Sequence, residues 1–225
     1  MFEVEIKSLL GGKEKADELR KKLTDSGFVN AKLTSIHGQR NHYFEGGNIQ
    51  KLYELVEPLL EGRAKEKLRL IVDKGKDISV RTREAKGKAL LVLKASVDDT
   101  TSANGISRAE FEEEIKGKGL DELDTLVLNA GFRYQAKWSR EREEYGVGEG
   151  ITVTIDKNAG YGYLAEFEKV VSEEGLVNEA QNELRELMNE FGAIELPQER
   201  LERMFAYYNE HWPEYYGTDK IFTIE

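Results

Sequence analysis

Charged side chains occupy every second position in several short stretches of this chain, and this spacing limits the folds that the chain can adopt. Near the N-terminus, Glu3, Glu5 and Lys7 alternate with apolar residues, and Arg81 and Arg83 repeat the spacing further along. Residues i and i+2 of a β-strand point to the same side of a sheet, so each set places its charges on one face. The pattern therefore predicts β-strands that are apolar on one face and charged on the other.

Eight stretches show short-period alternation and are predicted to be strands. They are Phe2–Ser8, Ala31–Phe44, Ile78–Glu84, Leu90–Ala95, Ser107–Lys116, Tyr134–Tyr145, Gly150–Lys157 and Tyr163–Val171. The sign of the charge differs from strand to strand: Arg140 and Arg142 lie on one, Glu166 and Glu168 on another. We therefore expect acidic and basic clusters on separate strands of one sheet.

Apolar residues at helical spacing separate the predicted strands. Five helices are expected, with apolar stripes at Ala16–Leu23, Ile49–Leu59, Leu120–Ala130, Ala180–Phe191 and Leu201–Tyr208. Asn48 is placed to cap the second helix, Gly27 to end the first and Gly192 to end the fourth. The stretch Glu61–Lys76 fits neither period and receives no assignment. The segment Glu45–Lys76 as a whole is longer than a plain strand connection. It is either a helical insertion over one end of the strands or a packing insertion, and we favour packing.

The composition excludes several classes of protein. Charged residues make up 34% of the 225 residues, but 39% are hydrophobic, so disorder does not explain the charge. The net charge of −10 argues against a nucleic-acid or membrane partner bound by a broad basic face. The absence of cysteine excludes disulfides, zinc thiolate sites and cysteine nucleophiles. With no signal-peptide pattern at the N-terminus, the chain is expected to be cytoplasmic.

A closed barrel accounts for charges of both signs on so many strands. An open antiparallel sheet with one wet face would also tolerate the pattern, because charged residues are normally exposed. A closed barrel would turn the same face inward, where acids and bases must pair or hold ions. The expected fold is therefore α+β: a closed, eight-stranded antiparallel barrel with a charged lumen and flanking helices. No linker divides the chain, so residues 1–225 are expected to form one domain.

The charged face has a chemical use if it lines one interior. Carboxylates suit Mg²⁺ or Mn²⁺, which prefer oxygen ligands. Arginine binds phosphate through paired hydrogen bonds, and lysine binds it as a point charge. Together they would bind a metal–polyphosphate complex. No phosphate-binding glycine loop, HExxH or GxSxG motif offers a competing chemistry.

The order of the charged stretches resembles that of the CYTH superfamily, the triphosphate tunnel metalloenzymes. EVEIK at residues 3–7 resembles the ExExK signature of that family. The stretches that follow in family order are QRNHYF at 39–44, RTR at 81–83, LVLK at 91–94, RAEFE at 108–112, REREEY at 140–145, and the acidic strands at 156 and 166–168. The match spans roughly residues 1–170. The resemblance implies a barrel core over this span, with C-terminal helices at about 173–211 packed against it.

The resemblance also implies a role for each charged position. The metal ligands would be Glu3, Glu5, Glu166 and Glu168, with Asp156 and Glu112 as partners for a second ion. The triphosphate would be held by Lys7, Arg81, Arg83, Lys94, Arg108, Lys137, Arg140 and Arg142. Residues with a direct part in the reaction would be Lys7, Asp156 and Tyr43. The implied cofactor is Mg²⁺ or Mn²⁺.

The chain departs from the family pattern at two positions. Asn41 stands where the family has Asp, which puts any role of that position in doubt. Arg140 stands where Lys is usual, and Lys137 lies close by in the sequence. The three histidines, His37, His42 and His211, have no ligand spacing and are interpreted as ordinary polar residues.

Three functions stay open at this point. The leading hypothesis is a metal-dependent hydrolase of thiamine triphosphate, tripolyphosphate or a nucleoside triphosphate. A class IV-type adenylyl cyclase, which converts ATP to cyclic AMP and pyrophosphate, would use the same strands. A non-catalytic module that binds polyphosphate or nucleotides is the third. The partner in each case is a triphosphate-containing small molecule, and both a monomer and a homodimer are open.

Overall fold

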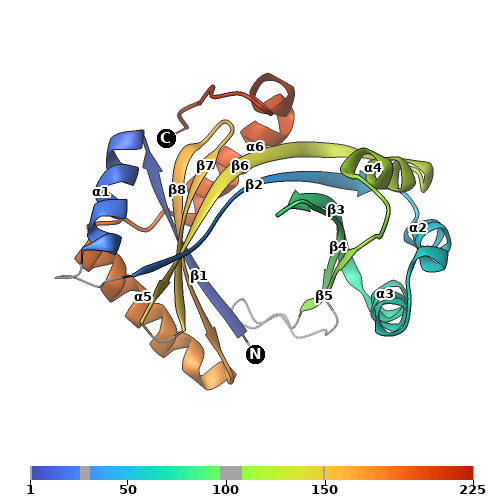
Figure 1. Cartoon of the computed structure of the whole chain (residues 1–225), viewed down its shortest axis with the longest axis horizontal. Coiled ribbons are helices and arrows are strands. Elements are labelled where there is room, and N and C mark those ends of the chain that lie inside the picture. Colours follow the sequence, from blue (N-terminus) through green and yellow to red (C-terminus); the bar gives the residue numbers. More distant parts are fainter. Residues whose placement is uncertain (1, 26–30, 97–107, 149, 225) are drawn as a thin grey trace. The chain divides into compact units, whose positions relative to one another are not determined.

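Groups of strands and groups of helices follow one another along the chain (Figure 1). The computed structural model describes residues 2–25, 31–96, 108–148 and 150–224. The strands are β1 (Phe2–Gly11), β2 (Lys32–Gly46), β3 (Lys76–Ala85), β4 (Lys88–Ser96), β5 (Arg108–Glu114), β6 (Phe132–Val147), β7 (Ile151–Asn158) and β8 (Gly162–Val171). The helices are α1 (Lys13–Thr24), α2 (Ile49–Val56), α3 (Arg63–Lys74), α4 (Leu120–Asn129), α5 (Val177–Phe191) and α6 (Gln198–Tyr215). Short 3₁₀ helices occupy Glu57–Leu59 and Glu174–Leu176.

The eight strands form one sheet in the order β1-β8-β7-β6-β2-β3-β4-β5. The pairs β1–β8, β2–β3, β3–β4, β4–β5, β6–β7 and β7–β8 are antiparallel. This confirms the predicted α+β class and the predicted antiparallel sheet. Closure of the sheet into a barrel stays a prediction, as does the single domain.

The contacts within the chain divide it into two compact units. The first unit comprises Met1–Gly38 and Ser139–Glu225, and the second comprises Gln39–Trp138. The long strands β2 and β6 contribute residues to both.

In the first unit, α1 and α5 cover one face of the sheet (Figure 1). The buried side chains come from alternate positions of the strands, such as Val4 and Ile6 of β1. They pack against helical stripes that include Leu19 of α1 and Leu184 of α5. Because strand side chains alternate between faces, this packing leaves Glu5 and Lys7 of β1, Asp156 of β7, and Glu166 and Glu168 of β8 on the opposite face.

The C-terminal segment of the first unit packs on the turn between β7 and β8. The amide of Gly160 donates to the carbonyl of Lys220, and the amide of Phe222 donates to the carbonyl of Gly160. Gly160 has φ +82°, and a Cβ there would lie 2.8 Å from the ring of Tyr208. Only glycine therefore fits this position without strain. The buried ring of Tyr161 completes the cluster, at 5.3 Å from the ring of Phe222.

The second unit has the same plan, with α2, α3 and α4 on one face of its strands (Figure 1). Phe44, Val80, Leu91 and Phe111 project from four neighbouring strands into this apolar layer. Arg81 and Arg83 of β3, Lys94 of β4, and Glu110 and Glu112 of β5 alternate with these residues and therefore face the other side.

The predicted elements agree with the structure except in one segment. Glu61–Lys76 received no assignment, but its central part forms α3. Leu68 and Ile71 are buried there, whereas Leu70 is 45% exposed. The apolar stripe is therefore narrow and is interrupted by an exposed leucine, which obscured the helical period. The prediction that Asn48 caps α2 is confirmed, because its side chain accepts a hydrogen bond from the amide of Lys51 at 3.0 Å.

Two helix ends test the glycine assignments. Gly192 follows α5 in the left-handed region, with φ +68°, as predicted. The first helix ends at Thr24, before the predicted stop at Gly27, which lies outside the described residues.

Candidate functional site

The charged face of the first unit is assembled by strand pairing between residues far apart in the sequence. Glu5 lies opposite Glu168, and Lys7 lies opposite Glu166. Directly opposed residues of an antiparallel pair point to the same side, so all four share one face. The backbone of Glu3 belongs to β1, but its side chain lies outside the described part of the structure.

A chain of ion pairs crosses this face from β1 to β6. The ammonium of Lys7 lies 3.4 Å from one oxygen of Glu166, and Arg142 donates to the other oxygen. Arg142 also donates to both oxygens of Asp156, at 2.7 and 2.6 Å. Arg140 donates to Asp156 at 2.8 Å, and Asp156 is fully buried. Both arginines are therefore held by one buried carboxylate.

The ionisation of this cluster follows from its neighbours. Burial opposes the charge of Glu166, but the charges of Lys7 and Arg142 outweigh burial and lower the pKa of Glu166. Burial also opposes the charge of Arg142, and here the hydrogen bond to Asp156 and the charge of Glu166 raise the pKa of Arg142. Glu166 is therefore an anion and Arg142 a cation at neutral pH.

The opposed pair of Glu5 and Glu168 fits a divalent cation by its chemistry. Like charges directly opposite on paired strands are destabilising. Lys7 pairs with Glu5 and offsets part of this repulsion, and a cation bound between the two glutamates would offset more. Their oxygens are of the type that Mg²⁺ and Mn²⁺ prefer. Among the described side chains, however, no group of three or more Asp, Glu or His residues is arranged to hold a metal. The described carboxylates therefore supply suitable ligands but not a complete coordination shell.

Thr154 adds a hydroxyl to this face that the sequence analysis did not single out. Thr154 lies opposite Glu166 in β8 and opposite Glu144 in β6. It is 2% exposed, and its hydroxyl has no hydrogen-bond partner among the described residues. A threonine within an alternating strand carries no signal that separates it from ordinary strand residues.

On the charged face of the second unit, strand β3 contributes two arginines, Arg81 and Arg83. Tyr43 lies opposite Arg81, and Asn41 lies opposite Arg83. The guanidinium of Arg81 stands 4.5 Å from the centre of the Tyr43 ring. Arg83 donates to the amide oxygen of Asn41 at 2.7 Å and to Glu112 at 3.0 Å. These contacts fix the two arginines side by side on one strand.

The neighbouring strands β4 and β5 continue the same face. Lys94 lies opposite Glu110, with 3.0 Å between the ammonium and a carboxylate oxygen. Glu114 is exposed and pairs with Lys88. The side chain of Arg108, which was predicted to bind the triphosphate, lies outside the described part of the structure.

Lys137 lies away from the other predicted phosphate ligands. Its ammonium stands 4.1 Å from the centre of the Tyr134 ring and 4.0 Å from Asp124 of α4. This position is on the side of the second unit that the helices cover, whereas Arg81 and Arg83 face the other side. We therefore omit Lys137 from the proposed site.

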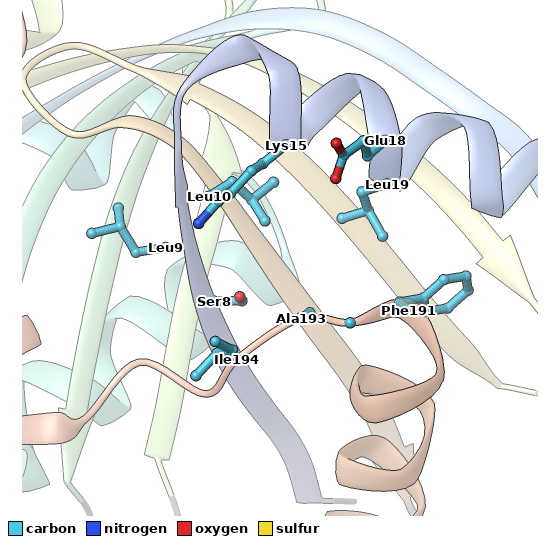
Figure 2. Close-up of a pocket in the computed structure, with 10 residues that line it drawn as sticks. Ser8, Leu9, Leu10, Lys15, Glu18, Leu19, Phe191, Ala193 and Ile194 are labelled. Atoms are coloured by element: carbon cyan, nitrogen blue, oxygen red, sulfur yellow. The ribbon is translucent and has the colours of Figure 1, made fainter.

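A small pocket in the first unit is separate from these charged residues (Figure 2). It lies between the end of β1, α1 and the segment after α5, and its volume is about 120 Å³. Leu9, Leu10, Phe191 and Ile194 make most of its lining apolar, and Lys15 reaches toward it. Ligand pockets are usually larger, from about 300 Å³. None of the predicted site residues lines it.

Comparison with protein-family models identifies the family of this chain. The CYTH domain family model matches residues 72–200, which is more than half of the chain. The chain belongs to the CYTH domain family. A search of curated proteins found no match to this chain. Among the described residues, no helix has the length and apolar character needed to cross a membrane.

Solved structures of similar fold cover nearly the whole of this CYTH protein. The PH1819 protein from Pyrococcus horikoshii OT3 is 20% identical with a TM-score of 0.60, and the match covers 92% of this chain and 99% of that one. An adenylate cyclase candidate from Vibrio parahaemolyticus is 15% identical with a TM-score of 0.56, covering 92% and 98%. An adenylyl cyclase candidate from Hippeastrum, described as having a dominant triphosphatase activity, is 17% identical with a TM-score of 0.52, covering 92% and 96%. At these identities the likeness supports the fold alone.

Proposed function

We propose that this CYTH protein is a metal-dependent triphosphate hydrolase that releases orthophosphate from an organic or inorganic triphosphate. The observation that carries the proposal is that each of the two units has a charged face built from alternate strand positions. One bears ion-paired Arg140 and Arg142 beside the carboxylates of β1 and β8, and the other bears Arg81 and Arg83. Membership of the CYTH family, whose members are metal-dependent enzymes acting on triphosphates, supports this use of the charges.

The metal would be Mg²⁺ or Mn²⁺, held by carboxylates of the first unit. Glu5 and Glu168 are the described ligands of choice, because they face each other and a cation would relieve their repulsion. Glu3 and Glu166 are the further ligands that the resemblance implies. A bound divalent ion would neutralise phosphate charge and orient the triphosphate.

The resemblance implies that Asp156 binds a second metal ion, but we propose a different role for it. Both of its oxygens already accept hydrogen bonds from arginine, and it is fully buried. We assign it the role of holding Arg140 and Arg142 in place. Arginines held in this way can stabilise charge on phosphoryl oxygens without first having to be ordered.

On the second unit, the proposed phosphate ligands are Arg81, Arg83 and Lys94. The ring of Tyr43 packs against the guanidinium of Arg81 and would orient it. Glu112 remains the proposed partner for a second ion, although in this structure it accepts from Arg83. Closure of the eight strands into a barrel is part of the proposal, because it follows from the same resemblance.

The test incubates the purified protein with tripolyphosphate, thiamine triphosphate or ATP, each with Mg²⁺, Mn²⁺ or EDTA, and resolves every product. Orthophosphate that forms only with metal is the expected result, and the fastest substrate identifies the preferred triphosphate. Cyclic AMP and pyrophosphate from ATP would replace the hydrolase by the cyclase. Binding without turnover of any substrate would make the protein a non-catalytic module.

A further inference from the structure

The helix-covered side of the second unit contains a buried carboxylate that the proposed reaction does not use. Asp124 of α4 is 3% exposed. The hydroxyl of Thr82 donates to one of its oxygens at 2.6 Å, and the hydroxyl of Tyr134 donates to the other at 2.6 Å. Nδ1 of His42 lies 2.7 Å from that second oxygen. One side chain thus joins α4 to β2, β3 and β6.

The direction of the bond to His42 follows from the charge of Asp124. Burial raises the pKa of Asp124, but the hydrogen bonds from His42, Thr82 and Tyr134 outweigh burial, and the pKa is lowered overall. An ionised carboxylate can only accept hydrogen bonds, so Nδ1 of His42 carries a proton and donates it. The ring of His42 is 2% exposed and meets the Tyr134 ring edge to face.

Two of the three strand residues bound to Asp124, His42 and Thr82, lie beside the proposed phosphate ligands Arg81 and Arg83. His42 pairs with Thr82 across β2 and β3. The next pair on one side is Tyr43 with Arg81, and the next pair on the other side is Asn41 with Arg83. Because side chains alternate between the faces of a sheet, a tether on the middle pair fixes the backbone beneath both arginines.

We propose that Asp124 is a positioning residue that sets the place of Arg81 and Arg83 by holding Thr82 and His42 against α4. The inference rests on the proposed function, in which these two arginines bind phosphate. Asp124 itself contacts no phosphate in this account. A strand that can shift relative to α4 would present its guanidiniums at the wrong distance, and small misplacements of binding groups are costly.

The test compares two single variants of the whole chain, each of which lacks one hydroxyl that donates to Asp124. Thr82→Val removes the bond from β3 to Asp124 and keeps the side-chain shape. Tyr134→Phe removes the bond from β6. Tyr145→Phe is the matched control, because the Tyr145 hydroxyl also donates to a carboxylate, that of Glu143 at 2.8 Å in the first unit. Leu123→Ala is the stability control, because Leu123 is buried on α4 and has no polar contact with the strands.

We expect Thr82→Val to raise KM for magnesium tripolyphosphate about tenfold while kcat changes much less, a size typical of slightly misplaced binding groups. Tyr134→Phe should raise KM by a smaller factor, because Tyr134 lies on β6 and does not adjoin Arg81 or Arg83, which both lie on β3. Tyr145→Phe and Leu123→Ala should lower the melting temperature and leave KM near that of the wild type. A KM in Thr82→Val that is no higher than in Leu123→Ala would overturn the inference.

A second measurement separates this inference from the proposed function. In the ¹⁵N spectrum of arginine side chains, the Nε–H of Arg83 reports its hydrogen bond to Asn41. Thr82→Val should shift or broaden that signal, and Tyr145→Phe should leave it unchanged, whether or not the protein hydrolyses a triphosphate. An unchanged Arg83 signal in Thr82→Val would refute the tether itself. A shifted signal in a protein whose wild type neither binds nor hydrolyses tripolyphosphate would support the tether but refute its functional role.

Discussion

At the scale of single residues, Asp156 illustrates how one buried charge can organise a site. It accepts from both Arg140 and Arg142 and has no exposed surface. We expect Asp156→Asn to lower the free energy of unfolding by about 3 kcal/mol, because the arginines lose their buried counter-charge. The matched control is Asp219→Asn. Asp219 pairs with Lys157 at 2.6 Å but is 84% exposed, so its loss should change little.

Chemical denaturation of the wild type and both variants at pH 7 measures these differences. Equal destabilisation by the two substitutions would contradict the assigned role of Asp156. Loss of stability in Asp156→Asn alone would agree with it.

The charge of Glu166 should make the free energy of unfolding depend on pH. Its pKa is lowered in the folded protein by Lys7 and Arg142, so its contribution to stability is present above the unfolded pKa and is lost as the pH falls through the folded pKa. Glu166→Gln should lower the free energy of unfolding by about 1–3 kcal/mol at pH 7. The difference from the wild type should shrink as the pH falls through the folded pKa of Glu166, because the protonated glutamate is then neutral, as glutamine is. Urea denaturation from pH 3 to 8, in EDTA, measures this difference, and a constant value across the range would contradict the assignment.

At the scale of elements, α3 offers two leucines that differ in burial on one helix. Leu68 is fully buried, and Leu70 is 45% exposed. Leu68→Ala should cost about 2–5 kcal/mol of unfolding free energy, as expected for a core cavity. Leu70→Ala should cost less than about 0.5 kcal/mol, as is usual for surface positions. Thermal and urea denaturation compare the two, and similar losses would mean that α3 does not pack as described.

The elements were largely predictable because each strand carries its own alternating pattern. β1 could be read from Glu3 to Lys7 alone, and the capping role of Asn48 from its place before an apolar stripe. α3 could not be predicted, because exposed Leu70 breaks the pattern set by Leu68 and Ile71. In that segment packing against neighbouring strands decides the structure more than the local sequence does.

At the scale of the whole molecule, the sequence indicated which residues share a charged face but not which of them pair. The pairing of Lys7 with Glu166 depends on β1 lying beside β8, and these strands are at opposite ends of the predicted core. The buried contacts of Asp124 were missed for a similar reason. An aspartate on an amphipathic helix is usually exposed, and its partner His42 had no ligand spacing in the sequence.

The proposed hydrolase function requires that the protein bind a complex of a divalent metal and a triphosphate. Isothermal titration calorimetry of the wild-type protein with tripolyphosphate, in Mg²⁺ and then in EDTA, tests this most directly. We expect saturable binding in Mg²⁺ and a clearly weaker affinity in EDTA. No binding in either condition, or the same affinity in both, would contradict it.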